Sequence, residues 1–181
     1  MRNFFLLLLF GALLMGSAAR AQAPAAEVQA LTVRLNELMH DPRQEPNTEV
    51  LASLANCGIK QTIRKYRTPE KHPTATNVAL SSSKNGSSWG FKTNEKVELE
   101  LILALDWAEV GSIAYAPQKE EKTGRRYYDL TMKRRERTNG KSAGGLTDTL
   151  TFALYSASEQ EAAELVRRLS ALSRQCQGHK S

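Results

Sequence analysis

Alternation of apolar and polar residues dominates the middle of the chain and predicts a series of strands. From Val97 to Leu105 every odd position is apolar, while Glu98 and Glu100 occupy positions between them. A period of two is typical of an antiparallel strand with one buried and one solvated face. The same reasoning predicts six further strands, at residues 59–66, 76–83, 88–93, 110–116, 125–137 and 146–156.

Before residue 58 the apolar residues recur at helical spacing instead. The first apolar set predicts an amphipathic helix that stops at Asp41-Pro42, and it consists of Val28, Leu31, Leu35 and Leu38. A second, shorter helix is predicted from a cap at Asn47 or Thr48 to Gly58. Its apolar side would consist of Val50, Leu51 and Leu54.

The clearest helix is the last one. Ser156 or Ser158 supplies its cap, and Glu159 and Glu161 lie in its first turn, where the helix dipole favours anions. One apolar stripe follows at helical spacing, made of Ala162, Leu165, Leu169, Leu172 and Cys176. We therefore expect this stripe to be buried against the sheet.

Seven sequential strands followed by one amphipathic helix predict an α+β fold. This order, together with the segment LDWAEVGSI at residues 105–113, resembles an exported bacterial variant of the pleckstrin-homology-like barrel over about Gly58 to Cys176. The resemblance implies a seven-stranded, antiparallel, strongly bent sheet or barrel, preceded by N-terminal helices, with the last helix plugging its open end. The alternative is a helix-grip fold, in which a curved sheet wraps the last helix and encloses an apolar cavity.

The LDWAEVGSI segment also carries two local expectations. If the register of the preceding strand continues, Trp107 points inward and Asp106 outward. Trp107 is then expected in the core rather than on a ligand-stacking surface. Asp106 is expected to accept hydrogen bonds from backbone amides and so to fix the turn.

The N-terminus has the layout of a secretory signal. Arg2 precedes an apolar run of about 12 residues, too short for the ~20 needed to span a bilayer, and small residues follow up to Ala21. We predict a signal peptide at residues 1–21, a helical segment and linker at 22–46, a single α+β domain at 47–176 and a flexible tail at 177–181. The expected location is periplasmic or secreted, without a membrane span after cleavage.

Charge adds one candidate surface. The formal charge of +6 falls to +4 without Arg2 and Arg20, and nine basic residues against four acidic ones lie between Lys119 and Lys141. Such a cluster either is a solvated hairpin or binds an envelope protein or anionic surface. The candidate partner-binding residues are Arg125, Arg126, Lys133, Arg134 and Arg135. Nucleic acid is not an expected partner, because the chain is exported and has no nucleic-acid-binding motif.

Cys57 and Cys176 are the only cysteines. In an oxidising compartment an even pair predicts a disulfide. Closing a loop of about 120 residues would stabilise the fold by about 4 to 5 kcal/mol in the chain-entropy treatment. The bond would attach the end of the last helix to the entrance of the strand that begins near Gly58.

Catalytic patterns are weak along the whole chain. The three histidines, at positions 40, 72 and 179, share no metal-ligand spacing. Glu98 and Glu100 resemble an acid-base pair but are expected on a solvated strand face. We therefore predict a non-enzymatic exported binding or structural module of the cell envelope, without metal or cofactor. The alternative is a carrier of a small apolar ligand.

Overall fold

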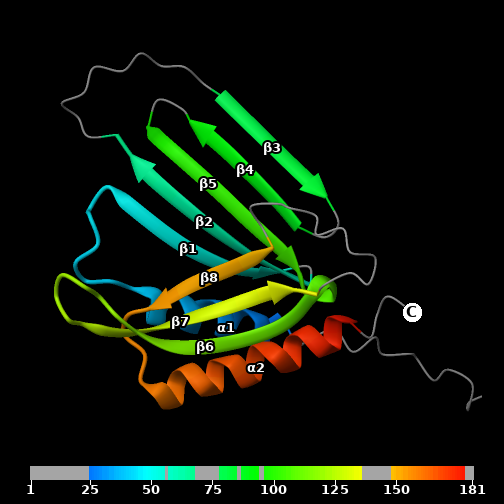
Figure 1. Cartoon of the computed structure of the whole chain (residues 1–181). Helices are drawn as coiled ribbons and strands as arrows, with labels where there is room; N and C mark the ends of the chain where they lie inside the picture. The colour runs from blue at the N-terminus through cyan, green and yellow to red at the C-terminus, as the bar shows by residue number, and fades with distance from the viewer. Residues whose placement is uncertain are drawn as a thin grey trace, which may run out of the picture.

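A computed structural model describes residues 25–55, 57–67, 78–84, 87–93, 96–135 and 148–177. In these ranges the chain forms two α-helices, a short 3-10 helix and eight strands (Figure 1). The predicted signal peptide lies outside the described residues. So does the predicted tail, apart from Gln177, which ends the last helix.

Five strands form an antiparallel sheet of order β1-β2-β5-β4-β3. They are β1 (Thr48–Ala55), β2 (Gly58–Tyr66), β3 (Val78–Lys84), β4 (Ser87–Thr93) and β5 (Val97–Asp106). β5 lies at the centre, where it pairs with β2 on one side and β4 on the other. The strand with the clearest alternation thus has two neighbours, while β1 and β3 form the edges.

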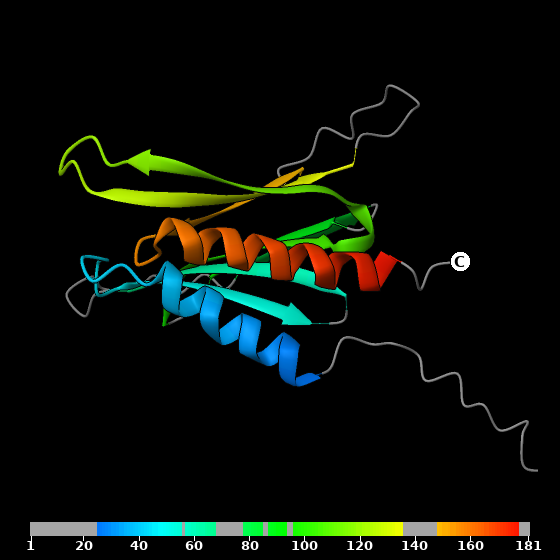
Figure 2. The ribbon, with the colours of Figure 1, turned by 90° about the horizontal axis from the view of Figure 1, so that it is seen from below.

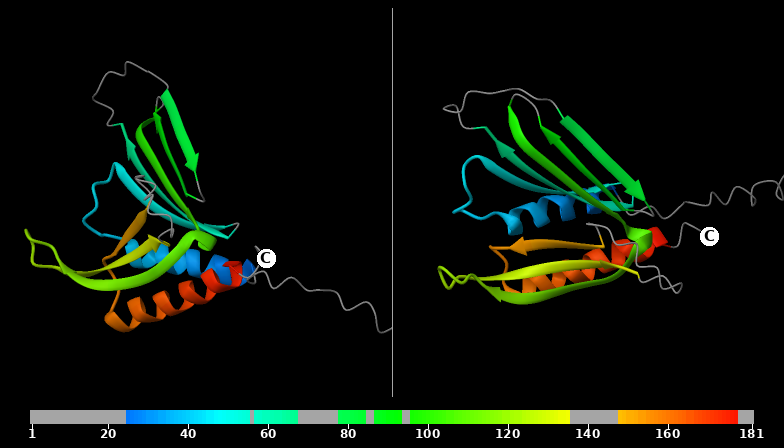
Figure 3. Two further views of the ribbon diagram at one scale, coloured as in Figure 1. Left: turned by 45° about the vertical axis from the view of Figure 1, so that its right-hand side comes forward. Right: turned by 45° about the horizontal axis from the view of Figure 1, so that its top comes forward.

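A second antiparallel sheet contains the remaining three strands in chain order. They are β6 (Val110–Lys119), β7 (Arg126–Arg134) and β8 (Thr149–Leu154). The chain passes from β5 into this sheet through the 3-10 helix η1 (Trp107–Glu109). The two sheets meet near this turn and diverge from it (Figure 3).

The two α-helices lie side by side beneath the smaller sheet (Figure 2). α1 (Ala25–Met39) packs mainly on β1 and β8, and α2 (Glu159–Gln177) packs on β6, β7 and η1. Ser158 caps α2: its hydroxyl accepts from the N–H of Glu161, whose carboxylate accepts from the N–H of Ser158. Strands β3 and β4 extend away from both helices (Figures 1 and 3).

One hydrophobic core joins both helices, the smaller sheet and the near end of the larger sheet. The predicted α2 stripe is confirmed as buried, from Ala162 to Cys176. The same core contains residues of α1 and of both sheets, among them Leu35, Leu54, Ile59, Leu105, Leu130 and Phe152.

The α+β prediction is confirmed, but the predicted second helix is wrong, because residues 48–55 form β1. Val50 and Leu54 fit a helical spacing as well as a period of two, so local pattern does not separate the two structures. Pairing decides the outcome: Leu54 lies opposite Ile59 and Val50 opposite Ile63 in a hairpin with β2. Tertiary contacts thus override the local helical pattern.

All seven predicted strands are present as β2 to β8, and β1 is an additional strand. They do not form a single bent sheet. Among the described residues the strands divide into sheets of five and three, without a closed barrel. α2 therefore lies along the smaller sheet rather than in the mouth of a barrel. The resemblance to pleckstrin-homology-like and helix-grip folds stays a prediction.

Side chains of α1 occupy the free edge of β1. The side-chain amide of Asn36 donates to the carbonyl of Ala52 and accepts from its N–H, both at 2.8 Å. The hydroxyl of Thr32 accepts from the N–H of Leu54 at 3.3 Å. Asn36 thus completes at this edge the pair of bonds that a sixth strand would make, which satisfies backbone groups that burial would otherwise leave unpaired.

Replacement of Asn36 by Ala should therefore destabilise the fold by roughly 2 to 4 kcal/mol, because both backbone groups of Ala52 lose their partner. Asn36→Asp keeps the acceptor but loses the donor and should have an intermediate effect. Urea unfolding followed by circular dichroism measures both changes. A loss below about 0.5 kcal/mol for Asn36→Ala would show that water replaces the amide.

Candidate binding surface

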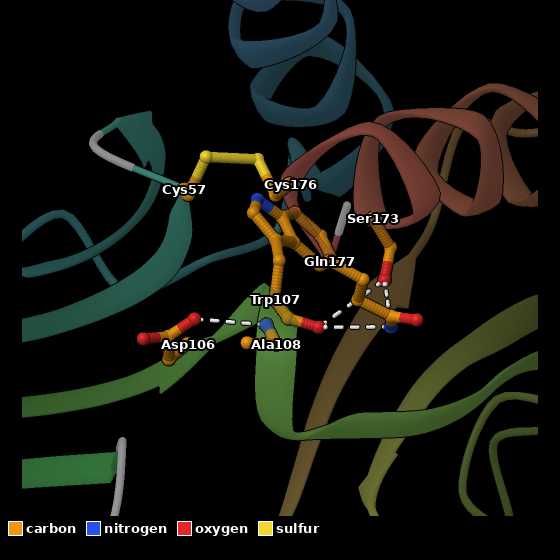
Figure 4. Close-up of a disulfide and its surroundings, with 7 residues drawn as sticks. All are labelled: Cys57, Asp106, Trp107, Ala108, Ser173, Cys176 and Gln177. Atoms are coloured by element: carbon orange, nitrogen blue, oxygen red, sulfur yellow. Dashed lines mark hydrogen bonds between the residues drawn. A yellow bond between two sulfur atoms is a disulfide. The ribbon is translucent and has the colours of Figure 1, made fainter. Parts of the chain in front are cut away.

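The disulfide between Cys57 and Cys176 is confirmed and lies at the junction of the two sheets (Figure 4). Cys57 lies between β1 and β2, and Cys176 is in the last turn of α2. Their Cα atoms are 5.5 Å apart, and 119 positions separate them in the sequence. The described residues contain no free cysteine. The pair therefore holds α2 to the larger sheet, and we assign it a structural role.

Trp107 lies beside this bond and is 1% exposed, which confirms that its side chain belongs to the core. The N–H of Trp107 donates to the carbonyl of Cys57 at 2.9 Å. Its own carbonyl accepts from the Ser173 hydroxyl and the Gln177 amide at 3.3 and 3.1 Å. The carboxylate of Asp106 accepts from the N–H of Ala108 at 2.8 Å, as the sequence predicts. These bonds fix the turn between the sheets and leave the indole without access to a ligand.

Three of the five candidate basic residues of the β6–β7 hairpin make internal contacts. Arg125 bonds the Asp41 carboxylate at 2.6 Å and the carbonyl of Tyr155 at 3.2 Å, and its guanidinium lies 5.0 Å from the centre of the Tyr155 ring. Arg134 pairs with Asp148, and Arg135 donates to Gln177. These arginines join the hairpin to the α1–β1 loop, to the region before β8 and to α2.

The other two candidates, Arg126 and Lys133, are exposed. They are seven positions apart in β7, so the alternation of a strand places them on opposite faces of the smaller sheet. The five residues therefore do not form one continuous cationic surface. Sequence could not show this, because the carboxylate that bonds Arg125 is 84 positions away.

The contacts of Asp41 with Arg43 and Arg125 change the pKa of its carboxyl group. Burial alone would raise the pKa of its carboxyl, but the N–H of Arg43 and the guanidinium of Arg125 outweigh burial and lower the pKa. A carboxyl with a lowered pKa in the folded state contributes stability above its unfolded pKa. That stability is lost as pH falls through the folded pKa.

Arg125→Ser should therefore lower the free energy of unfolding by roughly 1 to 3 kcal/mol at pH 7. The loss should shrink at an acid pH below the lowered pKa of Asp41, where its carboxyl is protonated. The double variant Arg126→Ser/Lys133→Ser should change stability by less than about 0.5 kcal/mol. Chemical denaturation at both pH values measures all three expectations. Equal effects of Arg125→Ser and the double variant would refute the internal role of Arg125.

One face of the larger sheet carries a row of alternating charges. Glu49, Arg64, Glu100 and Lys92 lie directly opposite one another on β1, β2, β5 and β4. Arg64 bonds Glu100 at 2.5 Å and Glu49 at 3.3 Å, and the Tyr66 hydroxyl donates to Glu49 at 2.7 Å. The expectation that Glu100 lies on a solvated face is therefore wrong: it is buried beside Arg64, whereas Glu98 is exposed.

The bonds of this row shift the pKa of two of its members, Arg64 and Tyr66. The bond to Glu100 is the main cause that raises the pKa of Arg64, and the bond to Glu49 raises the pKa of the Tyr66 hydroxyl. The two bonds of Arg64 therefore link β1, β2 and β5 across this face.

A separate carboxylate, Asp129, lies on the outer face of the smaller sheet. Burial raises its pKa, a feature that also occurs at catalytic sites. Its neighbours directly across the strands are Ala116 and Ala153, and on the same strand face they are Tyr127 and Thr131. The described residues contain no group of three side chains that could hold a metal ion. His40 is exposed, and His72 and His179 lie outside the described residues.

The opposite face of the larger sheet is largely apolar, although Gln61 and Lys65 of β2 also lie on it. One cross-strand row, here called the Leu80 row, crosses all five strands and consists of Val50, Ile63, Leu101, Phe91 and Leu80. Trp89 and Leu103 are paired in the next row. Residues directly opposite one another share a face, so these side chains form a continuous surface.

Burial of this apolar face decreases with distance from the helices. Leu105, nearest η1, is 1% exposed, but the other inward residues of β5 are only partly buried. At the outer edge Leu80 is 57% and Val78 36% exposed. Strands β3 and β4 lie away from both helices (Figures 1 and 3). Large apolar side chains gathered on an exposed surface indicate an interaction site.

No helix in the described part of the chain is long and apolar enough to cross a membrane. No protein-family model, curated protein or solved structure matches the chain. Proposals about its function consequently depend on the geometry of its own surfaces.

Sequence reasoning did not identify the apolar face as a surface. The alternation in β5 indicates correctly which side chains share a face, but it does not show what covers them. The signal that was available is the length of the apolar pattern: Val78, Leu80, Trp89 and Phe91 continue it onto two further strands. One 19-residue helix, α2, is too small to cover five strands and the smaller sheet together.

Proposed function

We propose that this chain is a non-enzymatic, exported binding or structural module of the cell envelope, and that it holds its partner on the apolar face of the larger sheet. The observation that carries this proposal is the exposure of Leu80 and Val78 at the end of an otherwise continuous apolar surface. Burial of such a surface by a partner is favourable at about 25 cal/mol per Å² of apolar area.

The charge distribution supports an apolar contact over a cationic one. Arg125 and Arg134 contact acidic side chains of the same chain. Arg126 and Lys133 lie on opposite faces of β7 and cannot contact one flat anionic surface together. The role of the basic hairpin is therefore chiefly to attach β6 and β7 to the rest of the fold.

A non-enzymatic role is also supported by the arrangement of the titratable groups. Glu49 and Glu100 are bonded to Arg64, and Asp129 has two alanines across from it. Acid-base or nucleophilic catalysis requires at least two groups placed within reach of one reacting atom. For Glu49 and Glu100 the groups within reach are Arg64 and Tyr66 of the same row.

The alternative function is a carrier of a small apolar ligand on the same face. Trp89, Phe91 and Leu101 favour it, because aromatic and aliphatic side chains line most apolar ligand sites. The two hypotheses differ in the size of the partner: a carrier would bind an isolated long-chain fatty acid, whereas a docking module would not.

Capture from an envelope extract tests the main proposal. Immobilised residues 22–181 should retain a defined set of envelope components at both low and high salt, because apolar burial is not screened. Val78→Ser/Leu80→Ser should lose this capture. Val33→Ser, which changes a 51% exposed side chain on α1, is the matched control and should retain it. Capture that disappears at high salt, or that survives Val78→Ser/Leu80→Ser, would contradict the apolar face as the site.

Fluorescence offers a second, independent measurement. The chain has two tryptophans; Trp107 is buried in the core, while Trp89 is half-buried on the apolar face. Binding on this face should shift the emission of Trp89 to shorter wavelength, because its surroundings become less polar. Trp89→Phe should abolish the shift, whereas Trp107 continues to emit. Titration with palmitate decides between the hypotheses: a saturable shift supports the carrier, and its absence supports the docking module.

A further inference from the structure

The two edge strands of the larger sheet differ in the hydrogen bonding of their outer backbone groups. The edge of β1 is bonded by Asn36 and Thr32 of α1. β3 is the last strand at the other end, and no described residue pairs with its outer side. A free edge presents unpaired N–H and C=O groups that can pair with another strand.

The sequence of β3 lacks the usual devices that prevent such pairing. Proteins discourage edge pairing with proline, with charged side chains or with a covering segment. β6, also an edge strand, contains Pro117 and ends in Lys119. β3 has no proline, and its only charged residue is Lys84 at the end of the strand. From Val78 to Ser83 it is neutral on both faces.

We propose that two copies of this chain associate by antiparallel pairing of their β3 edges, with Leu80 of one copy opposite Leu80 of the other. In this register Val78 lies opposite Ser82 and Ala79 opposite Ser81, each pair occurring twice by symmetry. No charged residue faces a like charge within the paired segment, and Lys84 lies beyond it. A strand can meet its own copy in this way although the whole chain carries a formal charge of +6.

The Leu80 row explains why this register is favoured over its neighbours. Leu80 is the most exposed large apolar side chain among the described residues, at 57%. Directly opposite residues in an antiparallel pair lie on the same face with Cβ atoms about 5 Å apart. Pairing of the two leucines would therefore continue the row from Phe91 through both Leu80 side chains to Phe91 of the second copy. A shift by one residue would place the two apolar faces on opposite sides of the joined sheet.

Symmetry and area set the expected size and strength of the assembly. The contact uses the same surface on both copies, so it closes at two and joins the larger sheets into ten strands. Five paired residues on each side bury less than the ~1,200 Å² of a standard stable interface. We therefore expect a weak dimer, with a dissociation constant of roughly 10 µM to 1 mM. The inference does not rest on the proposed function, since the pairing uses the strand edge and leaves most of the apolar face open.

Sedimentation equilibrium of residues 22–181 over a concentration series tests the dimer. The unmodified chain should show a monomer–dimer equilibrium. Leu80→Lys and Leu80→Glu should each be monomeric, because two like charges would face each other. An equimolar mixture of the two variants should associate again, since lysine then faces glutamate. Val33→Lys, at an exposed apolar position on α1, is the control and should dimerise like the unmodified chain.

Each outcome bears on a different part of the proposal. A chain that stays monomeric up to roughly 1 mM would overturn the dimer. Association of Leu80→Lys as tight as that of the unmodified chain would show that another surface is used. Failure of the mixed variants to associate would rule out the register in which the two Leu80 side chains meet. Circular dichroism of every variant verifies that the exposed substitution leaves the fold intact.

Discussion

The fold depends on how Trp107 is enclosed at the turn between the two sheets. Its backbone N–H bonds the carbonyl of Cys57 and its carbonyl receives hydrogen bonds from α2, so one residue connects β2, β5 and the last helix. The disulfide adds a covalent link at the same place, worth about 4 to 5 kcal/mol in the chain-entropy treatment. Without these contacts, α2 would be held to the larger sheet only by packing.

Because these contacts lie at one end of the larger sheet, the other end is left largely outside the core. Both helices are placed against the smaller sheet and the near end of the larger one, where Ile59, Leu105 and Leu54 are buried. The apolar side chains farther along the same strands then have little of the core against them. The surface that we propose for binding is thus a geometric result of joining the two sheets at Trp107.

Patterns within one element were sufficient for much of the fold. The alternation in β5, the stripe on α2 and the inward position of Trp107 follow from periodicity alone, and the disulfide from the count of cysteines and the predicted export. The errors occur where a distant partner decides the structure. β1 is a strand because Leu54 meets Ile59, and the edge of β1 is covered because Asn36 meets Ala52. Arg125 is structural because Asp41, far away in the sequence, lies beside it.

The charged row on the opposite face fixes the register of the central strands. A different register would place the apolar side chains on the other face, but the charged row prevents it. A slip of one residue between β2 and β5 would move Glu100 to the apolar face and leave Arg64 without its partner. An uncompensated buried charge costs several kcal/mol, more than burial of one additional leucine would return. The pairing of Glu49, Arg64 and Glu100 therefore fixes the register. This register places Leu101, Phe91 and Leu80 on the face that the core covers only at its near end. The exposed apolar surface and the row of ion pairs therefore follow from the same register of the central strand.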